Sequence, residues 1–368
     1  MFTPLSSFAR IAVLLSAAAV LRVQAQGTFP ATPLASKHFA YPTGLPYQAD
    51  TEPNLIRGGQ TGYNICNSTT ENQESLCQTG FVNTLDDFCL WGAPEPDSVV
   101  GDTEGESVAW CTKPGRGTRL IPAGALKGVQ FMRTPDYVQV VGFIDQTQIN
   151  LQHGDFGGEM DPHGADLRGN PLGGLVYSNA WKGNGETFDQ VIEWHNFMGS
   201  DSFCFKVCDP AGPNAAKYCD HIYDRIGCQY NAPNAAQNGT FESCLGDNQD
   251  FPGIYTENGQ VMTYHQPEGP IPDMPYTARI PASSSCTPFE SASLFAALAS
   301  VTPTNGPAAS ASASGSAGAS GSRTSGGFTT RPTSSPSPSA SGTGAAETHA
   351  VSVVATLLGT VFTALFLS

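Results

Sequence analysis

Ten cysteines constrain this chain more than any other feature of its sequence, because they can cross-link distant segments. They form a group of four and a group of six, separated by 92 residues without a cysteine. An even number of cysteines in an exported chain indicates disulfide bonds. If each group pairs internally, the first allows 3 pairings and the second 15, and the sequence does not choose among them. The cysteines are Cys66, Cys77, Cys89, Cys111, Cys204, Cys208, Cys219, Cys228, Cys244 and Cys286.

The N-terminal residues have the pattern of an export signal. A polar segment that contains Arg10 precedes a short apolar run, and the small residues Val23 and Ala25 follow it. This pattern predicts a secretory signal peptide over residues 1–25, cleaved after Ala25. The alternative is an N-terminal membrane anchor, which the shortness of the apolar run disfavours.

The C-terminal residues predict a lipid anchor. An apolar tail over residues 347–368 has no basic residue behind it, and small residues with a polar spacer precede it. This combination is typical of a GPI-attachment signal, which is removed when the lipid is added. We place the attachment site near Ser341, Gly342 and Gly344. The alternative is a single transmembrane span, but such a span is normally followed by Lys or Arg.

Residues 296–346 separate this anchor from the rest of the chain. Ser and Thr make up 17 of the 40 residues between 307 and 346, and almost nothing in that stretch is apolar. Such a composition predicts a disordered, O-glycosylated stalk. Residues 26–295 then remain as one disulfide-bonded ectodomain, which is long enough to bury a core.

The ectodomain is strongly acidic. Four of the 17 basic residues and one of the 32 acidic residues lie outside it, which leaves 13 against 31 and a net charge of about −18. This charge repels nucleic acid and anionic lipid. We therefore expect no nucleic-acid partner, and contact with the membrane only through the lipid anchor.

The pattern of apolar residues predicts a mainly β fold, with a β-sandwich as the expected architecture. The first part of the ectodomain, to about Leu90, is rich in turn-forming residues and is expected to be irregular. β-Branched and aromatic runs bounded by Gly, Pro or Asp indicate strands. These runs cover residues 126–134, 136–145, 147–152 and 173–181, and residues 189–198 fit either a strand or a helix.

One or two short helices and two glycosylation sites complete the prediction. Tyr218, Ile222 and Ile226 recur every four residues, and Gly227 follows them, which predicts a helix that ends there. The sequons at Asn67 and Asn238 predict N-glycosylated surface loops.

Several phrases resemble a known family when they are taken together. They include GYNICNSTTENQESLCQT, DDFCLWG, DPHGADLRGNPLGGLVYS and YCDHIYDRIGCQYNAP, within about Phe39 to Phe289. The chain resembles the secreted glycoproteins of basidiomycete-type fungi known as macrophage-activating glycoproteins. The resemblance implies a fungal surface glycoprotein with a Ser/Thr-rich stalk and a lipid anchor. It supplies no catalytic or binding residues.

The most chemically loaded stretch is HGDFGGEMDPHGAD, residues 153–166. Two histidines and several carboxylates suggest a divalent metal site, although the spacing matches no established metal-binding template. The candidate ligands are His153, Asp155, Glu159, Asp161 and His163.

Two other interpretations of this stretch stay open. Glu159 with Asp161 or Asp166, or the distant Glu193, would suit acid–base cleavage of a glycosidic bond, and the tryptophans Trp91, Trp181 and Trp194 would then stack on sugar rings. Alternatively, the five nearby glycines make tight turns in which the acids bind local backbone.

Two functions follow from these observations. The first is a GPI-anchored protein of the fungal cell surface or cell wall, with a structural, adhesive or recognition role and with wall polysaccharide or a host surface as its partner. The second is an extracellular carbohydrate-active or metal-dependent enzyme that uses the His153–Asp166 stretch.

Overall fold

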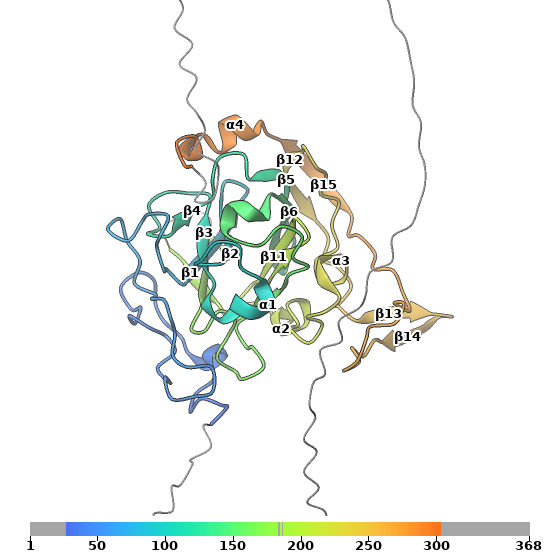
Figure 1. The fold of residues 1–368 in the computed structure, drawn as a ribbon. Coiled ribbons are helices and arrows are strands. Elements are labelled where there is room, and N and C mark those ends of the chain that lie inside the picture. The colour runs from blue at the N-terminus through green and yellow to red at the C-terminus, as the bar shows by residue number, and fades with distance from the viewer. Residues whose placement is uncertain (1–26, 183–184, 186, 303–368) are drawn as a thin grey trace, which may run out of the picture. The chain divides into compact units, whose positions relative to one another are not determined.

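A computed structural model describes residues 27–182, 185 and 187–302 as a mainly β fold (Figure 1). The predicted signal peptide, the GPI signal and almost all of the predicted stalk lie outside these residues. The first sheet has six strands in the order β4-β3-β2-β1-β8-β9, and the second has seven in the order β15-β12-β5-β6-β11-β10-β7. A separate hairpin pairs β13 with β14.

The strands of the six-stranded sheet are β1 (Thr79–Thr84), β2 (Asp87–Gly92), β3 (Val108–Cys111), β4 (Arg119–Leu120), β8 (Leu175–Ser178) and β9 (Asp189–Val191). Those of the seven-stranded sheet are β5 (Leu126–Arg133), β6 (Tyr137–Ile144), β7 (Gly158–Met160), β10 (Trp194–Gly199), β11 (Ser202–Cys208), β12 (Phe241–Gly246) and β15 (Ser283–Pro288). The hairpin strands are β13 (Ile254–Glu257) and β14 (Gln260–Thr263).

The helical elements are all short. The α-helices are α1 (Val100–Thr103), α2 (Ala215–Tyr218), α3 (Gly227–Asn231) and α4 (Ser291–Leu294). The 3-10 helices are η1 (Leu34–Ser36), η2 (Glu104–Glu106), η3 (Gln146–Ile149) and η4 (Ala296–Leu298). No helix among the described residues has the length and apolar character needed to cross a membrane.

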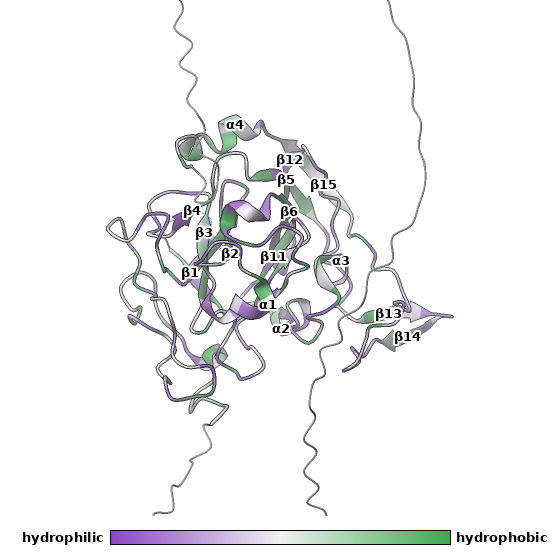
Figure 2. Cartoon of the chain, viewed as in Figure 1, coloured by the Kyte–Doolittle hydropathy of each residue, from purple (hydrophilic) through white to green (hydrophobic). Residues whose placement is uncertain are grey.

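The two sheets share one hydrophobic core, as in a β-sandwich. Side chains from β2 meet side chains from the second sheet: the rings of Trp91 and Trp194 lie 5.9 Å apart, and those of Phe88 and Phe203 lie 6.1 Å apart. The backbone N–H of Trp91 also donates to Oδ1 of Asn196 in β10 at 2.9 Å. Figure 2 shows apolar residues along strands of this interior, including β5, β6 and β12. The prediction of a mainly β fold is therefore confirmed.

The strand predictions were right for the central hairpin and wrong next to it. β5 and β6 pair antiparallel and turn at residues 134–136, as expected. Residues 147–152 are not a strand: η3 begins where Asp145 accepts the backbone N–H of Thr147, and it ends at Asn150 with a φ of 70°. Residues before Leu90 were expected to be irregular, yet β1 and most of β2 lie there. Both of these strands are buried on both faces, so their sequences do not alternate as an exposed strand does.

The prediction of a helix that contains Tyr218, Ile222 and Ile226 and ends at Gly227 is also wrong. Only the four residues of α2 are helical before Gly227, which begins α3 instead of ending a helix. Tyr218 is buried, whereas Ile222 is 57% exposed, so the four-residue spacing does not mark one apolar face.

All ten cysteines form disulfides, and each pair stays inside its own group. The pairs are Cys66–Cys77, Cys89–Cys111, Cys204–Cys228, Cys208–Cys219 and Cys244–Cys286. Cys89–Cys111 joins partner positions of β2 and β3, and Cys244–Cys286 joins β12 to β15. The other three fix segments that have little regular structure.

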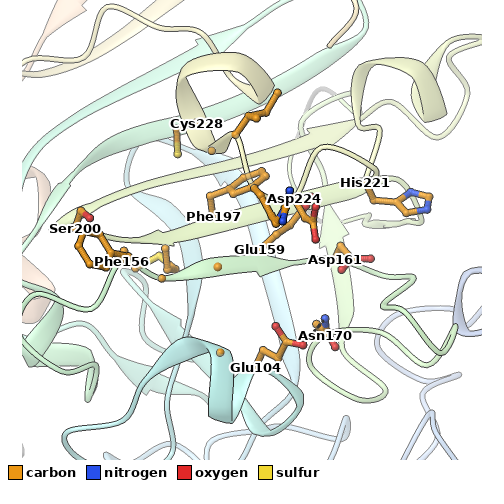
Figure 3. A pocket seen from close by; sticks show the side chains of 18 of the residues that line it. Glu104, Phe156, Glu159, Asp161, Asn170, Phe197, Ser200, His221, Asp224 and Cys228 are labelled. Atoms are coloured by element: carbon orange, nitrogen blue, oxygen red, sulfur yellow. Dashed lines mark hydrogen bonds between the residues drawn. The ribbon is translucent and has the colours of Figure 1, made fainter. Parts of the chain in front are cut away.

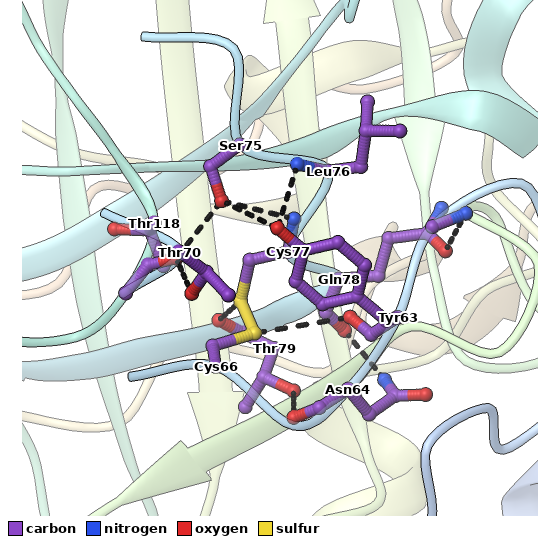
Figure 4. Close-up of a disulfide and its surroundings, with 12 residues drawn as sticks. Tyr63, Asn64, Cys66, Thr70, Ser75, Leu76, Cys77, Gln78, Thr79 and Thr118 are labelled. Carbon is purple, nitrogen blue, oxygen red and sulfur yellow. Dashed lines mark hydrogen bonds between the residues drawn. A yellow bond between two sulfur atoms is a disulfide. The ribbon is translucent and has the colours of Figure 1, made fainter. Parts of the chain in front are cut away.

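The irregular N-terminal segment is fixed by one of these disulfides and by buried amides (Figure 4). Next to Cys66–Cys77, the Nδ2 of Asn64 donates to the backbone carbonyls of Gln78 and Gly173, at 2.9 Å each. Because Gln78 directly precedes β1 and Gly173 lies two residues before β8, these bonds hold the segment against the start of both strands.

One face of the seven-stranded sheet is covered by residues 209–240, which we call the cover. Cys204 and Cys208 of β11 bind Cys228 and Cys219 of the cover. Ala232 packs with Phe197 and Cys204 in a small apolar cluster beneath it. The cover therefore seals polar side chains that would otherwise face solvent from this sheet.

Candidate functional site

An acidic cavity of about 780 Å³ lies where the cover, the end of β10, η2 and residues 156–170 meet. Figure 3 shows carboxylates from several of these segments around it. The acidic residues that line it are Glu104, Glu159, Asp161 and Asp224. Its volume lies within the range that is common for small-ligand sites, about 300–1,000 Å³.

Glu159 is the most deeply placed of these acids. It lies in β7 opposite Phe197 of β10, and only 6% of the residue is exposed. Its Oε1 has no hydrogen-bond partner among the described residues. Burial raises the pKa of Glu159 well above its ordinary value of 4.5, and the carboxylates of Asp161 and Asp224 raise it further. Its surroundings therefore favour the protonated form of the carboxyl.

Two basic side chains lie on the same face of the sheet as Glu159. His195 in β10 is the strand partner of Lys206 in β11, and both are fully buried. Nδ1 of His195 lies 3.6 Å from Oε1 of Glu159. Neither ring nitrogen of His195 makes a hydrogen bond of ordinary length to a described residue. The nearby backbone of Asp220 raises the pKa of the His195 ring and so partly opposes the effect of burial.

Burial disfavours the charged form of both of these groups. It lowers the pKa of His195 well below 6.5, and the charge of Lys206 lowers that pKa further. Burial also lowers the pKa of Lys206, whose Nζ donates to the backbone carbonyl of Asn231 and to Oε1 of Gln249. Burial thus favours the uncharged forms of both Glu159 and His195.

Asp161 and Glu104 border the same cavity and are held by local bonds. Oδ1 of Asp161 accepts the backbone N–H groups of His163 at 2.8 Å and Gly164 at 2.7 Å. Burial raises the pKa of Asp161, and these two bonds lower it. Glu104 accepts Nδ2 of Asn170 at 3.0 Å, and burial raises the pKa of Glu104 to about 6, against the opposing charge of Arg57.

Two histidines and a glutamate converge beside Asp161. Nε2 of His163 lies 3.4 Å from Oε2 of Glu193. The ring of His163 stacks on that of His221, with 3.7 Å between centroids and 8° between planes. One ligand atom from each of the three residues lies within 4.8 Å of the other two. Figure 3 shows His221 next to Asp161 at one end of the cavity.

The structure does not bring together the five residues that the sequence suggested as metal ligands. Glu159, Asp161 and His163 border the cavity or its edge, but His153 lies on an exposed turn. Oδ2 of Asp155 instead accepts the backbone N–H of Val100, where α1 begins, at 2.9 Å. The stretch 153–166 is therefore partly a structural loop and partly a cavity wall.

Asp166 and the tryptophans have structural roles. Both carboxylate oxygens of Asp166 bind the guanidinium of Arg57, at 2.5 and 2.8 Å. Trp91 and Trp194 are buried against each other, and Trp181 packs partly against the core. The rings of Trp91 and Trp194 fill the interior of the sandwich and are not available to stack on a sugar.

Sequence reasoning missed Glu104, His221 and Asp224. Glu104 lies far from the central motif in the chain, and nothing local marks it. His221 and Asp224 lie in the segment predicted as a helix, where their own spacing carries no metal or catalytic template. For His221 and Asp224, the available signal was that one histidine and two acids lie close together in the short stretch between Cys219 and Cys228.

The fold and the cavity define the class of this protein, which is a disulfide-bonded β-sandwich protein with a buried acid in a carboxylate-lined cavity. The chain is 43% identical over 235 residues to the appressorium protein ROW2 of Mycosarcoma maydis, a match that covers 63% of this chain and 77% of ROW2. It is 48% identical over 229 residues to the appressorium protein ROW1 of the same fungus, covering 62% of this chain but only 51% of ROW1. The chain belongs to the family of the fungal appressorium protein ROW2.

No protein-family model and no solved structure matches the chain. Membership of this family is consistent with a role at the fungal surface or cell wall.

Proposed function

We propose that this chain is an extracellular protein of the fungal cell surface, acting at the appressorium as its relatives' names suggest, and that its acidic cavity binds a cell-wall or host glycan. Membership of the ROW2 family supports the location at the fungal cell surface, and the acidic cavity supports glycan binding. The resemblance to macrophage-activating glycoproteins stays a prediction beside this proposal.

The observation that carries the glycan-binding proposal is the set of carboxyls that line one cavity of about 780 Å³, which are Glu104, Glu159, Asp161 and Asp224. Sugar hydroxyls donate and accept hydrogen bonds, so they match a cavity lined by carboxyl groups. A cationic amino sugar would also suit the net charge of about −18 on the ectodomain.

The test is a binding assay of the purified ectodomain on insoluble β-glucan, chitin and chitosan. We expect retention on at least one of them, and a loss of about tenfold or more in affinity for Glu159→Ala, which removes the whole carboxyl from the cavity. Asp273→Ala, at an exposed acid, is the matched control and should bind as the unchanged protein does. Equal binding by Glu159→Ala, or no retention on any glycan, contradicts the proposal.

Lipid anchoring is the second part of the proposal, and it rests on the small residues and apolar tail after the stalk. Phosphatidylinositol-specific phospholipase should release the protein from intact cells. Asn67 and Asn238 are both exposed, so N-glycosidase treatment should lower the mass of the released chain. Persistence of the apolar tail in the mature protein contradicts the anchor.

A second candidate function is glycan hydrolysis. The observation that favours it is the presence in one cavity of two carboxyls with raised pKa values, Glu159 and Glu104, because acid–base catalysis needs carboxyls in different protonation states. Release of reducing ends from a bound glycan, abolished by Glu159→Gln, would establish it. Binding without release leaves recognition as the function.

A further inference from the structure

We propose that His163, Glu193 and His221 bind one divalent transition-metal ion, with Zn²⁺ as the expected ion, at the edge of the acidic cavity. Two imidazoles and one carboxylate are a ligand set that zinc takes in proteins, with a fourth position left for water or substrate. This site is distinct from the set of five ligands suggested by the sequence, since it includes neither His153 nor Asp155. It is also independent of glycan binding.

The three ligands come from three segments that only the fold brings together. His163 follows β7, Glu193 lies between β9 and β10, and His221 lies in the cover. Their ligand atoms lie within 4.8 Å of one another. Ligands of a tetrahedral zinc at 2.0–2.1 Å are about 3.3 Å apart, so closure around the ion brings the ligand atoms together by up to about 1.5 Å, with rotation of the side chains.

The backbone of each ligand is held, so these movements are confined to side chains. Asp161 holds the backbone N–H of His163 at 2.8 Å. The carbonyl of Glu193 accepts the N–H of Cys208 at 3.0 Å, and Cys208 is bonded to Cys219, two residues before His221. The disulfide therefore holds the second histidine close to the glutamate.

The side chains themselves are free enough to turn. Those of His163 and Glu193 are 19% and 21% exposed, and His221 is half-buried. Stacked imidazoles point their nitrogens in parallel directions, so metal binding must rotate at least one ring out of the stack. The carboxylates of Asp161 and Asp220 interact with His221 and add negative charge around the site, which favours a cation.

The experiment is a titration of the intact ectodomain with Zn²⁺ by calorimetry, together with elemental analysis after dialysis. We expect one Zn²⁺ per chain, and a loss of affinity of at least about tenfold in His163→Ala and in His221→Ala. The matched control is His153→Ala, which removes an exposed histidine outside the site and should bind Zn²⁺ as the unchanged protein does.

If the unchanged protein binds less than one Zn²⁺ per chain at micromolar concentrations, the proposal is overturned. Unaltered binding in both site variants, or an equal loss in His153→Ala, would overturn it as well. Near-ultraviolet circular dichroism checks that each variant is folded, and Glu193→Gln replaces any histidine variant that is not. Because no glycan is present, the outcome stands apart from that of the glycan-binding assay.

Discussion

Nδ1 of His195 lies 3.6 Å from Oε1 of Glu159, and both side chains are almost fully buried on the face of the seven-stranded sheet under the cover. The two residues lie on neighbouring strands, and their side chains point to the same face of the sheet. Burial raises the pKa of the acid and lowers that of the base. The pair therefore stays uncharged over a range of pH in which free Glu and His side chains carry charge.

The first prediction concerns the pH dependence of stability. The folded-state pKa of Glu159 is raised, so its contribution to stability is fully present below pH 4.5 and is lost as the pH rises toward the folded-state value. Four carboxylates near it add to the effect, and His195 faces it as well; the carboxylates are those of Asp161, Asp224, Asp220 and Glu104. Glu159→Gln should gain stability relative to the unchanged protein between pH 5 and pH 7, by up to about 1.4 kcal/mol per pH unit.

Urea unfolding of both proteins at several pH values measures this difference. The lowered pKa of His195 acts in the opposite direction, because its contribution is present above pH 6.5 and is lost as the pH falls. Both proteins contain His195, so the comparison at each pH largely removes its effect. Parallel stability curves for the two proteins would contradict a raised pKa at Glu159.

The second prediction compares two glycines in the loop before β7. Gly154 and Gly157 have similar φ values of 78° and 83°. A Cβ at Gly157 would lie 1.5 Å from the carbonyl oxygen of Met198, whereas a Cβ at Gly154 would meet nothing within 4 Å. Gly154→Ala should cost about 1 kcal/mol, from backbone strain alone.

Gly157→Ala should cost several times more and should distort the wall of the cavity, because β10 would have to move away. Thermal unfolding of the two variants measures both effects. Similar melting temperatures would mean that residues 156–158 do not approach β10 as closely as described.

The third prediction concerns the disulfide that holds the cover. Replacing Cys204 and Cys228 together by Ala should cost about 3 kcal/mol, from the constraint on the unfolded chain. It should also speed hydrogen exchange in residues 220–231, because the cover loses one of its two disulfides to β11 and keeps only Cys208–Cys219. The same change at Cys66 and Cys77 should cost a similar free energy without affecting exchange in the cover. Mass-spectrometric hydrogen exchange separates the two results.

The fourth prediction compares a buried and an exposed ion pair. Arg168 is 1% exposed and binds Asp50 at 2.5 Å, so Arg168→Ala leaves a buried charge and should cost about 3–5 kcal/mol. Arg279 binds Asp250 at 2.9 Å with both side chains more than half exposed, and Arg279→Ala should cost less than about 1 kcal/mol. Urea midpoints measure both costs, and a small effect at Arg168 would mean that Asp50 reaches water.

The sequence predicted the hairpin of β5 and β6 because its β-branched runs and turn are local signals. It failed over residues 215–227 because two disulfides and a buried Tyr218 decide the backbone there, and they outweigh a weak helical spacing. It predicted that Glu159, Asp161 and Glu193 had chemical importance, and the structure places all three in or beside the cavity. It gave His153 and Asp155 the same weight, although one is exposed and the other binds the start of α1.

The sequence by itself determined the mainly β class, the parity of the cysteines and the acidic character of the ectodomain, because each depends on composition or on short-range pattern. Only the tertiary structure decided which cysteines pair, which acids lose contact with water, and that His221 meets His163 and Glu193. The cysteine pairs join residues 11 to 42 positions apart, and His163 and His221 are 58 positions apart. A sheet with its cover can bring such residues together in many registers. Packing selects one of these registers, and local sequence does not encode that choice.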